Sequence, residues 1–167
     1  MLQTVFGLPA HVLIVHAVVV LLPLGALGSI AAALRPRWRQ RYAWPVLGVS
    51  LVGALSATAA KIAGENFQER LKQAGVDNEL IQKHAALGAQ LQNWALGFGA
   101  AVIVLFVAGR LADRERSADG PGVTKTWRRI SVVVSVLVIA LAVVTTVQTV
   151  RTGHSGSTAV WTGVGGK

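Results

Sequence analysis

ISVVVSVLVIALAVVTTVQTV, residues 130–150, is an apolar run without a single charged side chain. Its length matches the roughly 20 residues that an α-helix needs to cross the hydrocarbon core of a bilayer. Three further apolar runs, over about residues 7–34, 44–63 and 84–109, reach a similar length. The sequence therefore predicts an all-α, polytopic membrane protein, a four-transmembrane-helix bundle that forms one domain over residues 1–167.

Composition supports a membrane protein and excludes several classes of function. Apolar residues make up 53% of the chain and charged residues only 14%, against about 25% charged in ordinary soluble domains. The 16 basic residues outnumber the 7 acidic ones, but they stand in short runs beside the apolar spans, which favours membrane loops over a nucleic-acid groove. The absence of cysteine excludes disulfides, thiolate-ligated clusters and thiol catalysis.

The distribution of arginine predicts the orientation of the spans. Arg35, Arg37, Arg39 and Arg41 separate the first two spans, and residues 110–129 hold a second basic run between the last two. Because basic loops stay on the cytoplasmic side, both termini are expected on the extracytoplasmic side of a bacterial inner membrane.

Two segments outside the spans are expected to differ in structure. Phe67, Leu71 and Ala74 recur at helical spacing among charges, which predicts a short amphipathic helix between the second and third transmembrane helices, lying along the membrane surface and ended by Gly75. The tail, residues 151–167, is rich in Gly, Ser and Thr and is expected to be mostly irregular.

Small and hydroxyl-bearing residues mark the faces on which the helices are expected to pack. They recur at helical spacing in every span and form one stripe along the fourth. The stripe consists of Ser131, Ser135, Ala142, Thr145 and Thr149. Stripes of this kind on several helices also permit a homo-oligomer.

Four histidines are the strongest chemical signal. At a helical rise of 1.5 Å per residue, His11, His84 and His154 each lie about 36–39 Å from the arginine run of their own helix, and His16 lies one to two turns deeper. All four therefore fall in the outer half of the membrane protein. Lys61 and Glu65, spaced i, i+4, are expected to neutralise each other rather than to relay protons.

This convergence has three interpretations. The first is b-type haem held by two histidines from different helices, with His16 and His84 or His11 and His84 as the pair. The second is a non-haem site for Zn²⁺ or copper. The third is purely structural, with half-solvated histidines bonded to carbonyl groups. No Ser–His–Asp arrangement, phosphate loop or HExxH motif is present, which favours an electron-transfer or accessory protein over a stand-alone enzyme.

Four short motifs resemble a known family. They are GLPAHVLIVH at residues 7–16, AGE at 63–65, HAALG at 84–88 and TGHSG at 152–156. In order and spacing they resemble the bacterial four-helix membrane proteins called domain of unknown function 2231, which typically read H-P-x-x-V-H near the N-terminus. Val12 replaces the usual proline of that motif, which loosens the helix start without removing a ligand.

The resemblance implies a site as well as an architecture. It points to His11, His16, His84 and His154 as the cofactor-binding positions. Related domains occur fused to Rieske-type or cytochrome c modules, which implies a redox-linked membrane role. Together with histidines on separate helices at compatible depth, this role favours haem b as the cofactor and a respiratory or other redox membrane complex as the partner.

Overall fold

The protein is a bundle of four long antiparallel helices, described here from a computed structural model for residues 4–5, 8–76, 78–118 and 126–161. The helices are α1 (Ala10–Leu34), α2 (Pro36–Gln73), α3 (Glu79–Ser117) and α4 (Thr126–Trp161). Ahead of α1, β1 (Thr4–Val5) and β2 (Leu8–Pro9) form a minimal antiparallel pair in which Thr4 lies opposite Pro9. All four helices are long and apolar enough to cross a membrane, which confirms the predicted fold class.

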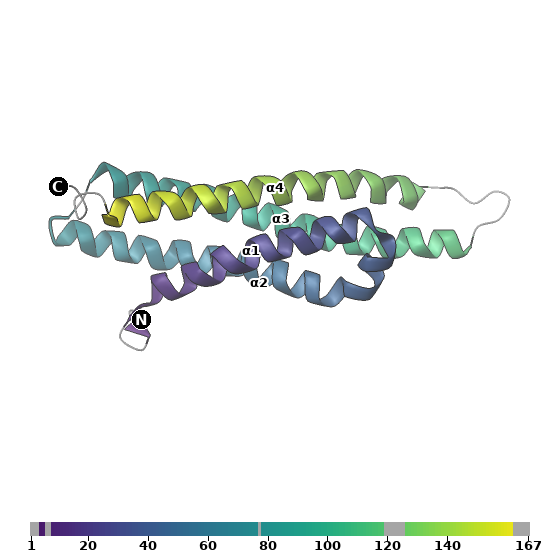
Figure 1. Ribbon diagram of the computed structural model, residues 1–167, viewed down its shortest axis with the longest axis horizontal. Coiled ribbons are helices and arrows are strands. Elements are labelled where there is room, and N and C mark those ends of the chain that lie inside the picture. The colour runs from purple at the N-terminus through teal and green to yellow at the C-terminus, as the bar shows by residue number, and fades with distance from the viewer. Residues whose placement is uncertain (1–3, 6–7, 77, 119–125, 162–167) are drawn as a thin grey trace.

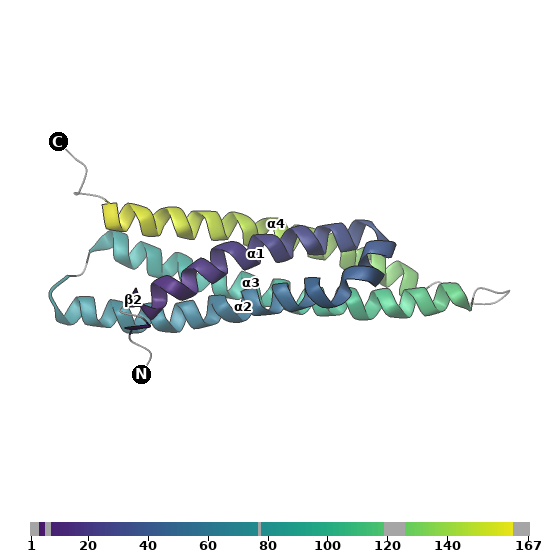
Figure 2. The same cartoon turned by 60° about the horizontal axis from the view of Figure 1, so that its bottom comes forward.

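The helices form two hairpins that pack against each other. Sequence neighbours α1–α2 and α3–α4 make one hairpin each, α2 lies against α3, and α1 lies against α4 (Figures 1 and 2). This order places every odd helix antiparallel to its neighbours. The arginine runs therefore collect at one end of the bundle, the arginine end, and the starts of α1 and α3 collect at the other, the histidine end.

Small residues let the helices approach closely, as the sequence predicted. Gly25 of α1 lies on Ser50 of α2, where an added Cβ would come within 2.8 Å of the serine Oγ. Phe98, Leu22 and Leu105 fill the centre between these contacts and are fully buried. Large apolar side chains such as Val132, Val133 and Val136 of α4 point outward, as they must where a helix faces lipid.

The second helix begins earlier than the apolar run and is kinked. Pro36 starts α2, and the backbone leaves helical geometry at Tyr42, with φ −111° and ψ 18°. Pro45 follows three residues later, and a proline ring clashes with the carbonyl one turn before it. The kink therefore separates a short arginine-bearing turn from the membrane-crossing part of α2.

The expected amphipathic helix along the membrane surface does not exist as a separate element. Instead α2 continues through Phe67 and Leu71 to Gln73 and ends just before Gly75, whose φ is +77°. Gly64 lies within this continuous helix and packs against the His11 ring of α1. The ion pair between Lys61 and Glu65, 2.8 Å, spans the same junction and confirms the predicted neutralisation.

The tail is also more ordered than its composition suggested. Residues 151–161 continue α4, and only residues 162–167 of the tail lie outside the described part of the chain. Side-chain hydroxyl groups stabilise this part of the helix. Ser157 and Thr158 both donate to the carbonyl of His154, and Thr152 donates to the carbonyl of Leu87 on α3. These bonds hold a Gly- and Ser-rich stretch in the helix that sequence composition alone assigns to a loop.

Candidate functional site

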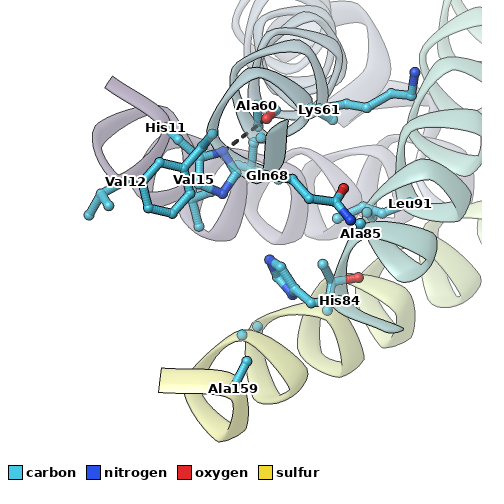
Figure 3. Close-up of a pocket in the computed structure, with 18 of the residues that line it drawn as sticks. His11, Val12, Val15, Ala60, Lys61, Gln68, His84, Ala85, Leu91 and Ala159 are labelled. Carbon is cyan, nitrogen blue, oxygen red and sulfur yellow. Dashed lines mark hydrogen bonds between the residues drawn. The ribbon is translucent and has the colours of Figure 1, made fainter. Parts of the chain in front are cut away.

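A pocket of about 510 Å³ opens at the histidine end between all four helices (Figure 3). Its lining is largely apolar, with Val15 and Val18 from α1, Ala57 from α2 and Leu91 from α3 among its walls. The polar groups that reach it are few and include three histidines. They are His11, His16, Lys61, Glu65, Gln68, His84, Thr149 and Thr152, with Ser157. A mostly apolar cavity with a few convergent polar groups is the usual form of a ligand site.

His11 lies in the first turn of α1 and is held by α2. Its Nδ1 lies 2.9 Å from the carbonyl oxygen of Ala60. Because a carbonyl only accepts, Nδ1 carries the proton and Nε2 keeps a free lone pair. Gly64, one turn beyond Ala60, lies directly against the ring, where an added Cβ would come within 3.0 Å of Cε1.

His84 lies in the second turn of α3 and is held in a similar way by α4. Its Nδ1 lies 2.9 Å from Oγ of Ser155, which itself donates to the carbonyl of Thr152 at 2.8 Å. The serine proton is thus already used, so its oxygen accepts from Nδ1–H and leaves the lone pair of Nε2 free. Gly156 lies against this ring, where an added Cβ would come within 2.9 Å of Cε1.

The two hairpins therefore build two matching half-sites. In each, an odd helix supplies a histidine at its start, and the following even helix supplies an acceptor for Nδ1 and a glycine that seats the ring. Figure 3 shows the rings of His11 and His84 directed into the same pocket from α1 and α3. Two imidazoles with fixed tautomers face one cavity.

The other two histidines are placed differently. His16 also lines the pocket, but it is exposed and its Nδ1 bonds to the carbonyl of Val12 in its own helix at 2.6 Å. His154 is exposed on α4 and is not among the residues that line the pocket. The structure thus brings His11 and His84 together, adds His16 from one side, and leaves His154 apart.

The donor set limits what kind of metal centre the pocket offers. Within residues 4–5, 8–76, 78–118 and 126–161, no three side chains of His, Asp or Glu are grouped so that they could hold a metal ion. A closed zinc site takes four protein ligands, and a catalytic one takes three. The described residues supply only a facing pair.

Sequence reasoning found the histidines but missed the residues that position them. Ala60, Gly64, Ser155 and Gly156 fall in or beside the motifs AGE and TGHSG, so the signal was present in the spacing. What those motifs do depends on the pairing of α1 with α2 and of α3 with α4, which the sequence does not display.

A buried ion pair at the arginine end was also missed. Arg39 of α2 is only 4% exposed, and its guanidinium donates to Asp113 and the Gly109 carbonyl of α3 and to Ser131 of α4. Gly109 lies in direct contact with the guanidinium group. A Cβ added at this position would overlap the Arg39 side chain. Charge runs at helix ends are usually solvated, so nothing in the sequence indicates that one arginine of the four turns inward.

Comparison with known proteins identifies the family. No curated protein and no solved structure is detectably similar to the chain. One family model, described as a predicted membrane protein, matches residues 7–167 and so covers all four helices and all four histidines. The chain belongs to this family, DUF2231.

Proposed function

We propose that this membrane protein binds b-type haem between His11 and His84 and serves electron transfer, either alone or as a subunit of a redox membrane complex. The observation that carries the proposal is the pair of imidazoles that line one pocket from α1 and α3, each with Nδ1 bonded to the following helix. A histidine that ligates a metal almost always donates its other ring N–H to a carbonyl, carboxylate or similar acceptor. Both histidines have this arrangement before any ligand is added.

The pocket suits a large flat apolar group. Its volume of about 510 Å³ lies within the roughly 300–1,000 Å³ of ordinary cofactor and ligand sites. Gly64 and Gly156 fix the ring planes from behind, and Gly88, which lines the pocket, has open space where a Cβ would stand. These features leave room between the rings rather than closing it.

The choice of pair follows from the same contacts. Depth along the helices alone allows two pairs, His16 with His84 and His11 with His84. His16 is exposed and bonded within its own helix, whereas His11 is tied to α2 as His84 is tied to α4. The geometry favours His11 and His84.

Haem bound here would supply reversible one-electron transfer, and the residues that hold it, with their hydrogen bonds, would set its potential. The chain's own residues would hold the iron and exclude water through Val15, Val18 and Leu91. By the positive-inside rule, we further propose that this end faces the extracytoplasmic side of a bacterial inner membrane, where soluble redox partners could reach it.

The test is the visible spectrum and metal content of protein purified in detergent from cells supplied with haem precursor. We expect a Soret band and about one iron per chain. His11→Ala and His84→Ala should each abolish or strongly reduce the band, and His154→Ala should leave it unchanged. A matched elution profile by size exclusion shows that each variant is folded.

A colourless, iron-free preparation would contradict the proposal. The same elemental analysis separates the alternatives. Stoichiometric Zn²⁺ or copper without iron would assign the imidazoles to a non-haem site, and the absence of any metal would leave the histidines as structural groups that join helices.

A further inference from the structure

A second hollow, of about 560 Å³, lies at the arginine end, far along the bundle from the histidines. We refer to it as the basic groove. It is lined by Gln40 of α2 and by Arg110, Asp113, Arg114, Ser117 and Ala118 at the end of α3. Nothing in the proposed haem site uses these residues.

Both oxygens of the Asp113 carboxylate in the basic groove already accept hydrogen bonds from neighbouring side chains. Oδ1 of Asp113 accepts from Arg39 at 3.2 Å and from Arg116 at 3.1 Å, and Oδ2 accepts from the amide of Gln40 at 3.0 Å. Among residues 4–5, 8–76, 78–118 and 126–161, no carboxylate forms an ion pair with Arg110 or Arg114. The groove therefore presents positive charge that its own acid does not neutralise.

Aromatic side chains place this charge at the membrane surface. The guanidinium of Arg110 lies 5.4 Å from the ring centre of Trp44, which is 71% exposed. Trp38, Tyr42 and Trp127 are also partly exposed at this end, at 40–46%. Tryptophan and tyrosine concentrate where the hydrocarbon core meets the headgroups, so Arg110 is held at headgroup level.

The face of α3 that leads to the groove changes from apolar to basic along one stripe. Ile103, Val107, Arg110 and Arg114 follow one another at i, i+4, i+7 and i+11, so they lie on one side of the helix. Ile103 and Val107 are 43% and 53% exposed, and both arginines are exposed as well. An acyl chain fits the first half of this stripe and a phosphate fits the second.

We infer that the basic groove binds the headgroup of an anionic phospholipid, with Arg110 and Arg114 on the phosphate and the acyl chain along Ile103 and Val107. The inference rests on charge complementarity and on the position of the groove at the aromatic level. It is independent of haem binding at the opposite end. Basic pockets between transmembrane helices are known to hold acidic lipid headgroups.

The experiment counts lipids retained by detergent-purified protein in native mass spectrometry at fixed salt, with phosphatidylglycerol or phosphatidylcholine added. We expect one phosphatidylglycerol to be retained preferentially. Two arginines, each contributing about 1 kcal/mol to an anionic surface, predict a roughly 30-fold weaker affinity in the double variant Arg110→Gln, Arg114→Gln.

The matched control is Arg37→Gln with Arg129→Gln, which removes the same charge from exposed residues at the same end but outside the groove lining. Unchanged retention in this control, with loss in the groove variant, supports a defined site. Equal loss of phosphatidylglycerol from both double variants would overturn the inference, because diffuse surface charge would then explain the retention. Equal retention of phosphatidylcholine, or displacement of the lipid by millimolar inorganic phosphate, would also overturn it.

A second measurement does not depend on how the variants fold. Because a ligand that binds only the native state raises its stability, phosphatidylglycerol should raise the thermal unfolding midpoint of the unaltered protein more than phosphatidylcholine does. An equal rise with both lipids would contradict the inference.

Discussion

His11 and His84 occupy equivalent positions but are held by acceptors of different character. His11 donates to a backbone carbonyl within α2, which cannot move without disturbing the helix. His84 donates to a serine hydroxyl, which can rotate. The hydrogen bond to the non-ligating nitrogen orients the ring and tunes its strength as a ligand, so the His84 half-site is the more adjustable of the two.

At this scale, Gly156→Ala should damage the site without removing a ligand. Its Cβ would stand 2.9 Å from Cε1 of His84, so the ring must move away from Ser155. Loss of such a supporting contact typically costs 10–100-fold in metal affinity, and we expect about a tenfold loss of haem affinity. The measurement is a haem titration followed by absorbance.

Gly48→Ala in α2 is the matched control, because an added Cβ at Gly48 meets nothing within 4 Å and Gly48 does not line the pocket. It should leave haem affinity unchanged and stabilise α2 by about 0.5–1 kcal/mol, as alanine does in place of an interior glycine. Equal haem affinities for the two variants would show that Gly156 does not seat the ring.

The turns of α2 and α4 that extend beyond their apolar spans supply the residues with which these two helices contribute to the site. Helices of 38 and 36 residues are far longer than a bilayer requires. Their outer turns carry Gly64 and Phe67 on one side and Ser155 and Gly156 on the other, so the pocket is built where these helices leave the apolar region.

The continuity of α2 can be measured directly, since the chain has no cysteine to interfere with labelling. Spin labels at Leu55→Cys and Ala74→Cys, both exposed, should be separated by about 28 Å between backbone positions if the helix is unbroken. A helix that turned along the membrane surface at Gly64 would bring them to roughly 20 Å. A distribution centred at the shorter value would contradict the extended helix.

The junction of α2 with α3 and α4 at the arginine end depends on Arg39. Gly109→Ala should push the guanidinium off its site and separate it from Asp113. Breaking a buried ion pair leaves an uncompensated charge, and we expect a loss of about 3 kcal/mol in the free energy of unfolding. Thermal or denaturant unfolding in detergent provides the measurement.

Gly97→Ala in the same helix is the comparison, because an added Cβ there meets nothing within 4 Å. It should be neutral or slightly stabilising. If both variants unfold alike, Arg39 contributes nothing particular to the junction.

The number of spans and their small-residue contacts could be predicted because lipid imposes simple rules on length, charge and packing. The element ends could not. The i, i+4 spacing of Phe67 and Leu71 predicts a separate surface helix, and the Gly- and Ser-rich motif TGHSG is typical of a loop. In each case a partner helix decided the outcome: Gly64 packs on His11, Gly156 packs on His84, and serine and threonine hydroxyls complete α4.

At the scale of the whole molecule, the bundle separates two kinds of chemistry by its length. One end gathers paired imidazoles around an apolar pocket, and the other gathers arginines, aromatic rings and the basic groove. The antiparallel order of the four helices produces this polarity. The α1–α2 and α3–α4 connections both lie at the arginine end, and the α2–α3 connection lies at the histidine end.

The orientation of that polarity in the membrane is testable with a matched pair of sites. Ala74 and Ala118 both cap helix C-termini, and each amide bonds to the carbonyl four residues earlier. We expect a membrane-impermeant maleimide to label Ala74→Cys in cells in which only the outer envelope has been permeabilised. The same reagent should label Ala118→Cys only after the inner membrane is permeabilised as well. The reverse pattern would place the histidine end in the cytoplasm.

The central claim is that His11 and His84 together ligate one iron. The most direct test is low-temperature electron paramagnetic resonance of the oxidised, haem-loaded protein. We predict a low-spin ferric signal typical of two imidazole ligands, which His11→Ala and His84→Ala each abolish, so that any haem still bound gives a high-spin signal. A high-spin signal in the unaltered protein, or a low-spin signal that survives both substitutions, would contradict the account.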